Sequence, residues 1–422
     1  MAGKTSVFTV ESVPGLIDGL TKFIGMQRIK KSVATWRNTM SRATPVEKMH
    51  HLGATFYWWP GFAQYWDSTK DGTPYTVATI LLAKDALKVL EAETGMPATV
   101  KAKYAGALGD TGNAQTHFFE ISMAHHFMGL GHRIKWFEDE GRGIGEFVVV
   151  TPTIEIEVEC KHLSVDAGRQ VTRKEFSQLC ALIDAQLRTQ RVMGNIHITL
   201  HKRLPKSADQ LAGIATEIGS GQLMGTAEFA PWGRATLELS PANDVAINWE
   251  QSQTQIRQDM GPVGHAMLRA GRLNDQPVNP ISMVLHSEKS DEFLMSMYDT
   301  MKDAAGRQLS GSRPGLLCIH LPEINDFPGL MDESGLKAVT SFFFSKEHNN
   351  HVCAISYSSD TKIVEDATGI NFSADALAYK NALCRFPEAK GIKLFDVEYF
   401  PPELQPSELV QMQDFDTAQD NA

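Results

Sequence analysis

Up to about residue 110, the apolar positions of the chain recur at the three- and four-residue spacing of helices. Val13–Met40 and Tyr75–Thr94 are the clearest predicted helices, and the second one can bury a single face. Between them lies ATFYWWPGFAQYW, at 54–66, where aromatic residues are dense but are not interleaved with Arg or Lys. We therefore expect these aromatic rings to form the core of a helical domain over 1–112 and not a platform for stacking bases.

From Thr116 the pattern changes. A helix is predicted to run from Thr116 to about Leu130 and to stop at Gly131, followed by a strand at Arg133–Phe137 and another that starts near Glu146.

IEIEVECKHLS, at 154–164, alternates strictly between apolar and charged residues. Because successive side chains of a strand point to opposite faces, one face is apolar and the other is charged. The charged face carries Glu155, Glu157, Glu159 and Lys161. Taken alone, this pattern is typical of an amphipathic strand at a sheet surface with solvated charges.

Helical and strand patterns alternate through much of the remaining chain, which predicts an α/β fold. Helices are expected at Thr172–Arg188 and Asp291–Leu309, and strands at Asn195–His201, Ala227–Phe229, Ala235–Leu239, Ile281–Ser287, Pro314–Pro322 and His351–Tyr357. Residues 401–422 are rich in Pro, Gln and acidic residues, and we expect a disordered acidic tail there.

Composition narrows the class of protein. With 422 residues, the chain is long enough for two or three domains, and its longest apolar runs are too short to cross a bilayer. Five scattered cysteines without a CxxC pair and the absence of a signal-like N-terminus predict a cytoplasmic protein without a disulfide framework. A net charge of −10 argues against a protein that coats DNA but leaves room for a local basic groove.

Acidic residues follow the predicted elements in a particular order. Glu120 lies on a helix, Glu146 starts a strand, and Glu159-x-Lys161 lies on the next strand, within FFEISMAHHFMGLGHRIKWFE, GEF and VECKHLS. Over about Thr116 to Ser164, this order resembles the PD-(D/E)xK, or restriction-endonuclease-like, nuclease superfamily. The resemblance implies a mixed sheet flanked by helices and a metal-dependent nuclease activity.

The resemblance also implies roles for individual residues. Glu146, Glu159 and the backbone carbonyl of Cys160 would bind Mg²⁺ or Mn²⁺, which neutralises charge on the phosphate and supplies hydroxide. Lys161 would orient the attacking water, and Glu120 would assist the metal or hold Lys161.

One departure from the family pattern concerns the acid at the start of the strand. The family usually has Asp there, often after Pro, whereas this chain has Gly145-Glu146. We favour Glu146 because it directly precedes a β-branched strand, over the nearby Glu138, Asp139 and Glu140. Glu157 is the reserve ligand.

Related nucleases carry a Gln on the helix that follows the E-x-K strand. Two segments fit that helix, one placing Gln178 at the site and the other Gln308. The segment with Gln308, DTMKDAAGRQLSGSRPGLLCIHLP, is closer to the family phrasing. It would make 166–280 an insertion, or a second α/β module, within a nuclease-like domain over 113–400.

The resulting hypothesis is a Mg²⁺-dependent endonuclease that hydrolyses DNA, in bacterial or phage defence or in DNA processing. Basic residues near the motif are expected to contact DNA, namely Arg169, Arg173, Lys174, Lys202 and Arg203. A homodimer is left open, and no membrane partner is expected. Two competing hypotheses stay open: an inactive nuclease-fold protein that binds nucleic acid or serves as a scaffold, and an unrelated α/β protein with an amphipathic strand.

Overall fold

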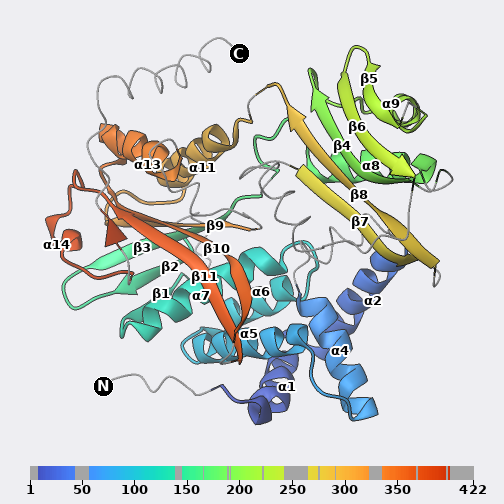
Figure 1. Cartoon of the computed structure of the whole chain (residues 1–422). Helices are drawn as coiled ribbons and strands as arrows, with labels where there is room; N and C mark the ends of the chain where they lie inside the picture. Colours follow the sequence, from blue (N-terminus) through green and yellow to red (C-terminus); the bar gives the residue numbers. More distant parts are fainter. Residues whose placement is uncertain are drawn as a thin grey trace.

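The chain folds into a mixed α/β protein with two separate β-sheets (Figure 1). The computed structural model describes residues 8–42, 57–137, 145–164, 166–187, 190, 192–220, 223–241, 265–273, 276–289, 291–322, 335–366, 369–395 and 398–399. The predicted tail at 401–422 lies outside them.

The larger sheet has seven strands in the order β1-β2-β3-β9-β10-β11-β12. They are β1 (Arg133–Trp136), β2 (Phe147–Val150), β3 (Glu155–His162), β9 (Gly315–Leu321), β10 (Val352–Asp366), β11 (Gly369–Lys380) and β12 (Glu398–Tyr399). The first three strands form an antiparallel meander, whereas β3, β9 and β10 are parallel. The sheet is therefore mixed, and β3 lies near its middle.

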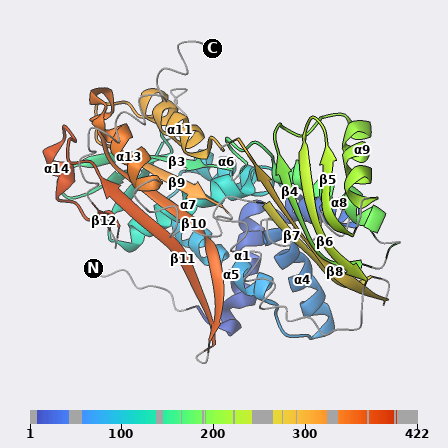
Figure 2. The ribbon, with the colours of Figure 1, turned by 45° about the horizontal axis from the view of Figure 1, so that its top comes forward.

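Helices cover both faces of this sheet (Figures 1 and 2). One face packs against α7 (Ala114–Gly129). This helix shares a hydrophobic cluster with α1 (Val13–Ile24), α2 (Met26–Arg42), α4 (Trp58–Asp71), α5 (Val77–Glu93) and α6 (Ala98–Leu108), and the short helix η1 (Val10–Ser12) precedes α1. The other face packs against α11 (Phe293–Arg307) and α13 (Leu336–Ser345). The short helices η2 (Glu347–Asn349) and α14 (Pro387–Lys390) complete this part of the chain.

The second sheet has five strands in the order β5-β6-β4-β8-β7 and a hydrophobic cluster of its own. It is built from α8 (Arg173–Leu187), β4 (Val192–Leu200), α9 (Ala208–Gly219), β5 (Met224–Phe229), β6 (Gly233–Pro241), β7 (His265–Leu273) and β8 (Gln276–Ser287). All of these residues follow β3 and precede α11, so this sheet overlaps the predicted insertion at 166–280. The domain boundaries themselves stay predictions.

The chain enters and leaves the second sheet at one tight junction. The N–H of Glu292 donates to the Gly168 carbonyl at 2.7 Å. Gly168 has a φ of 68°, and a Cβ at this position would lie 2.3 Å from the Glu292 carbonyl oxygen. Only glycine fits here, because both the backbone conformation and the close approach exclude a side chain.

Several predicted elements are confirmed, and one is corrected. Helix α5 and strand β3 form where the spacing predicted them, and Trp58, Trp59 and Phe62 of the aromatic stretch are buried in the core. The predicted helix Val13–Met40 is instead two helices, because Gly25 adopts a φ of 99° between them. Across the described residues, no helix combines the length and apolarity that a bilayer crossing requires.

Replacing Gly168 by Ala should destabilise the protein by about 2 to 4 kcal/mol, because a positive φ and a backbone clash add together. The matched control is Gly213→Ala in α9, where a Cβ meets nothing within 4 Å and helix propensity should stabilise by about 0.5 to 1 kcal/mol. Urea unfolding of both variants checks this. Equal effects of the two substitutions on the free energy of unfolding would contradict the conclusion that only glycine fits at position 168.

Candidate active site

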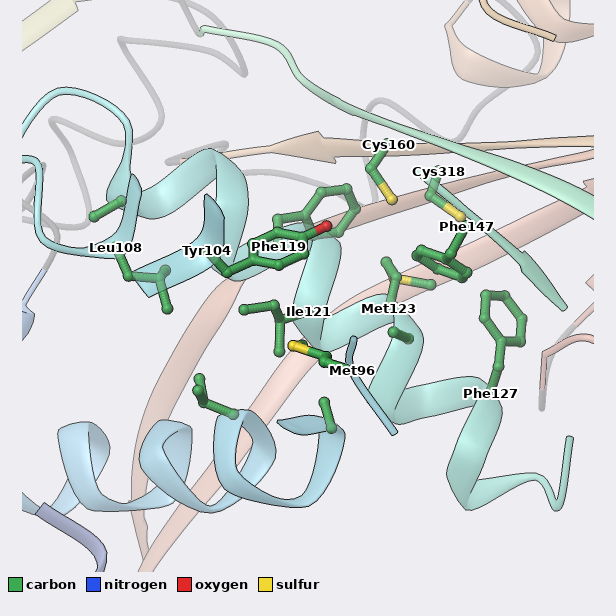
Figure 3. Close-up of a cluster of buried hydrophobic side chains, with 14 of the residues drawn as sticks. Met96, Tyr104, Leu108, Phe119, Ile121, Met123, Phe127, Phe147, Cys160 and Cys318 are labelled. Carbon is green, nitrogen blue, oxygen red and sulfur yellow. The ribbon is translucent and has the colours of Figure 1, made fainter. Parts of the chain in front are cut away.

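Strand β3 carries two different faces in the structure, as its alternation predicted. Ile156, Val158 and Cys160 belong to the cluster on the α7 side of the sheet. Figure 3 shows Cys160 and Cys318, from neighbouring strands, together with Phe147 above Met123 and Phe127 of α7. Burial raises the pKa of the Cys160 thiol far above its usual range, so this side chain packs and does not react.

The acidic face of β3 is not solvated at Glu159. This residue is 1 % exposed, and the Lys161 ammonium donates to its Oε1 at 2.6 Å. Burial raises the pKa of Glu159 from 4.5 to about 7, Lys161 opposes the shift, and the charges of Glu146 and Glu120 add to it. The simple interpretation of β3 as a strand with solvated charges is therefore wrong at this position.

Glu146 is placed by the turn that precedes β2. The Gly145 N–H donates to the Gln308 carbonyl at 2.6 Å, and the Glu146 N–H donates to the Val158 carbonyl at 2.8 Å. The Glu146 carboxylate lies 3.4 Å from the Lys103 ammonium of α6. Burial and then the charge of Glu120 raise its pKa. Glu146 thus directly precedes β2, the strand that pairs with β3. The charge of Glu120 raises the pKa of both Glu146 and Glu159.

Glu120 approaches from α7 and is 2 % exposed. His117, one turn earlier on the same helix, places its Nδ1 3.1 Å from the Glu120 carboxylate. This hydrogen bond raises the pKa of His117. The Tyr104 hydroxyl of α6 also lies beside Glu120, and burial together with the charges of Glu120 and Glu146 raises its pKa. Glu120 is therefore fixed by polar partners from two helices.

The two candidate glutamines lie in different parts of the fold. Gln308 follows α11, and its carbonyl holds Gly145, so it adjoins Glu146 in the structure. Its side-chain Oε1 is buried without a hydrogen-bond partner among the described residues. Gln178 is exposed on α8, which packs against the second sheet. Of the two, only Gln308 has a backbone hydrogen bond to a residue beside Glu146 within the described part of the chain.

Glu157, the reserve ligand, has a structural role instead. Its carboxylate accepts hydrogen bonds from the Ser310 N–H at 2.8 Å and from the Ser310 hydroxyl at 2.6 Å. Arg313 lies 3.9 Å from Glu157 and 3.3 Å from Glu155. Glu157 therefore holds the turn between α11 and β9. The three acids that precede Glu146 in the chain, Glu138, Asp139 and Glu140, lie outside the described residues.

Three neighbours of the carboxylates were not predicted from the sequence: Lys103, Tyr104 and His117. Lys103 and Tyr104 come from α6, and no spacing pattern connects that helix with Glu146 or Glu159. The His117–Glu120 pair does have a signal, because residues three apart lie on the same side of a helix.

The donor set fits a hard divalent cation. Mg²⁺ is usually held by one or two carboxylates, with water and substrate phosphate completing the shell. Within the described ranges, no three His, Cys, Asp or Glu side chains are already grouped to bind a metal ion. Instead, each of the two proposed ligands contacts a lysine, at 2.6 Å for Glu159 and 3.4 Å for Glu146. A cation would compete with these ammonium groups for the same oxygens.

Comparison with protein-family models, with curated proteins and with solved structures found no match. The arrangement of residues is therefore the basis for the functional argument.

The raised pKa of Glu159 makes stability depend on pH. A carboxyl that is harder to ionise in the folded state stabilises the fold below pH 4.5, and this contribution is lost as the pH rises through about 7. Glu159→Gln stays neutral, so its stability relative to wild type should increase by on the order of 2 to 3 kcal/mol between pH 5 and pH 8 without metal.

Urea unfolding across this pH range in EDTA measures the effect. The matched control is Glu155→Gln on the same strand, since its side chain is 35 % exposed. This control should follow the wild-type curve. If Glu159→Gln also ran parallel to wild type, Glu159 would ionise as in water and its burial would have no electrostatic consequence.

Proposed function

We propose that this protein is a metal-dependent nuclease that hydrolyses DNA phosphodiester bonds. The observation that supports this most is a group of three carboxylates, the buried Glu120 and Glu159 and the partly buried Glu146, with Lys161 in contact with Glu159. Burying several carboxylates together costs free energy, and such an arrangement is typical of a site where a cation or a reaction uses them.

Each residue has a role in the proposed chemistry. Glu146 and Glu159 would hold Mg²⁺ or Mn²⁺, with the Cys160 carbonyl as a further oxygen donor on the same strand. The cation supplies charge neutralisation at the phosphate and lowers the pKa of a bound water. Once released from Glu159, the Lys161 ammonium would orient that water. The backbone carbonyl of Gln308 accepts a hydrogen bond from the N–H of Gly145, next to Glu146.

Lys103 adds a second cation to this proposal. Its side chain is half exposed and contacts Glu146, so it lies between the buried carboxylates and solvent. Because Lys103 is half exposed beside Glu146, its ammonium would be placed to contact a phosphate of the substrate. The acidic chain would thereby carry a local positive charge at the point where a polyanion must approach.

One of the five basic residues that were expected to contact DNA does not fit that role in the structure. Arg169 is buried, and its pKa is lowered by burial but supported by Asp291 and Asp166. It therefore contributes to the junction with the second sheet and is not available to contact phosphates. Lys174, Lys202 and Arg203 are exposed and stay candidates. A setting in defence or in DNA processing follows only from the family resemblance.

Cleavage should require Mg²⁺ or Mn²⁺, because the proposed ligands are all oxygen atoms. Ca²⁺ should permit DNA binding without turnover, and excess EDTA should abolish cleavage. Nicking of plasmid and of short duplexes by the full chain measures this. Cleavage that persists at full rate in EDTA would exclude the proposed mechanism.

Lys161→Ala should reduce cleavage by about 10² to 10⁴, since water-activating groups typically contribute that much. The fold should be retained at a cost of about 1 kcal/mol or less, because Glu159 can take up a proton when its partner is removed. Lys302→Ala, which removes an exposed lysine of α11, is the control and should cleave like wild type.

Plasmid nicking, DNA binding and thermal melting of the three proteins give the answer. Wild-type cleavage by Lys161→Ala would rule out its catalytic role. DNA binding by wild type and variant with cleavage by neither would favour a nuclease-fold protein that binds nucleic acid without cutting it.

A further inference from the structure

A cavity of about 580 Å³ lies on the α7 side of the larger sheet. Its walls come from α5, from α7, from the end of β9 and from the middle of β10, and Phe395 also lines it. The volume lies within the range that small-molecule sites occupy. None of Glu120, Glu146, Glu159 or Lys161 lines it.

Aromatic rings form much of the wall. Phe119 of α7 is stacked on His320 with ring centroids 5.0 Å apart, and Phe395 is stacked on His126 at 5.3 Å. Figure 3 shows Phe119 and Met123 on the side of α7 that faces the sheet. All four residues line the cavity, and aromatic side chains are a favourable contact surface for a planar ring.

The same cavity contains hydroxyl groups that can donate and accept hydrogen bonds. Ser356 of β10 is buried, and Ser358 lies 3.2 Å from the Nδ1 of His320. The Ser122 hydroxyl of α7 is buried and has no hydrogen-bond partner among the described residues. A buried hydroxyl without a partner costs free energy, which a ligand that hydrogen-bonds it would recover.

The charges around the cavity compensate each other. Asp85 is 3 % exposed, accepts a hydrogen bond from the Trp58 indole at 3.0 Å, and lies 3.5 Å from the Lys88 ammonium. His125 lies 2.6 Å from Glu91. Asp85 and Lys88 both line the cavity and offset each other, so the lining has no excess positive charge to attract an anion and suits an uncharged polar ring.

We propose that this cavity binds a nucleobase, either as a free nucleoside or as a base of a bound nucleic acid. Nucleobases are flat and uncharged, and they carry both donors and acceptors on their edges, which matches stacked aromatic walls lined with hydroxyl groups. The cavity also adjoins the candidate active site, since Phe119 and Glu120 are neighbours on α7 and the His320 ring lies 5.3 Å from that of His162.

The test uses the full chain in EDTA, so that no cleavage interferes. Calorimetry with adenosine, guanosine, cytidine and thymidine measures free nucleosides, and a single-stranded oligonucleotide with 2-aminopurine reports a base that stacks inside the protein. Ser122→Phe fills the cavity and should weaken either signal at least tenfold. Ser122→Ala removes only the hydroxyl and should weaken it a fewfold.

Ser345→Phe is the matched control, because Ser345 is exposed at the end of α13 on the opposite side of the sheet. It should bind like wild type, and thermal melting verifies that all variants fold. Binding of nucleosides that Ser122→Phe loses supports a soluble ligand, and a 2-aminopurine signal alone that it loses supports a base of bound DNA.

Two results would overturn the proposal. One is the absence of both signals in wild type. The other is binding of an apolar ring such as toluene without any nucleoside or base signal, which would show an ordinary apolar cavity. Because cleavage is not measured here and Glu120, Glu146 and Glu159 do not line the cavity, failure of this proposal is distinguishable from failure of the proposed nuclease activity.

Discussion

The candidate site depends on the burial of an ionisable carboxylate with a single close cation. Glu159 is almost fully enclosed, and the Lys161 ammonium compensates only part of the cost of removing its charge from water. The surrounding elements contribute the other charged residues of the site: α7 contributes Glu120, the turn before β2 contributes Glu146, and α6 contributes Lys103. A protein selected only for stability would not need such an arrangement, because an apolar residue at Glu159 would avoid its cost.

Local spacing predicted the parts of the fold in which one element buries one face. Helix α5 and strand β3 are of this kind, since 3.6- and 2-residue periods are visible in the sequence. The break at Gly25 was not predicted, because the apolar pattern continues on both sides of it. The pairing of β3 with β9 depends on residues far apart in the chain, and it was not predicted from the sequence.

The candidate site follows the same division. Glu120, Glu146, Glu159 and Lys161 were found because their order on predicted elements matches a known family. Their polar neighbours Lys103 and Tyr104 are contributed by α6. Nothing in the spacing of residues along that helix indicated that it would contact Glu120 or Glu146. Conversely, Glu157 shares the spacing of Glu159 but binds Ser310, so equal spacing on a strand did not indicate equal function.

The junction at Gly168 also bears on how the larger sheet assembles. Pairing β3 with β9 closes a loop of about 150 residues, and the entropic cost of such closure grows with the logarithm of loop length. If the second sheet forms first and brings Gly168 against Glu292, the open part of that loop shrinks to about 30 residues and closure becomes easier by about 1.4 kcal/mol. The second sheet would then lower the entropic cost of forming the larger sheet around Glu159.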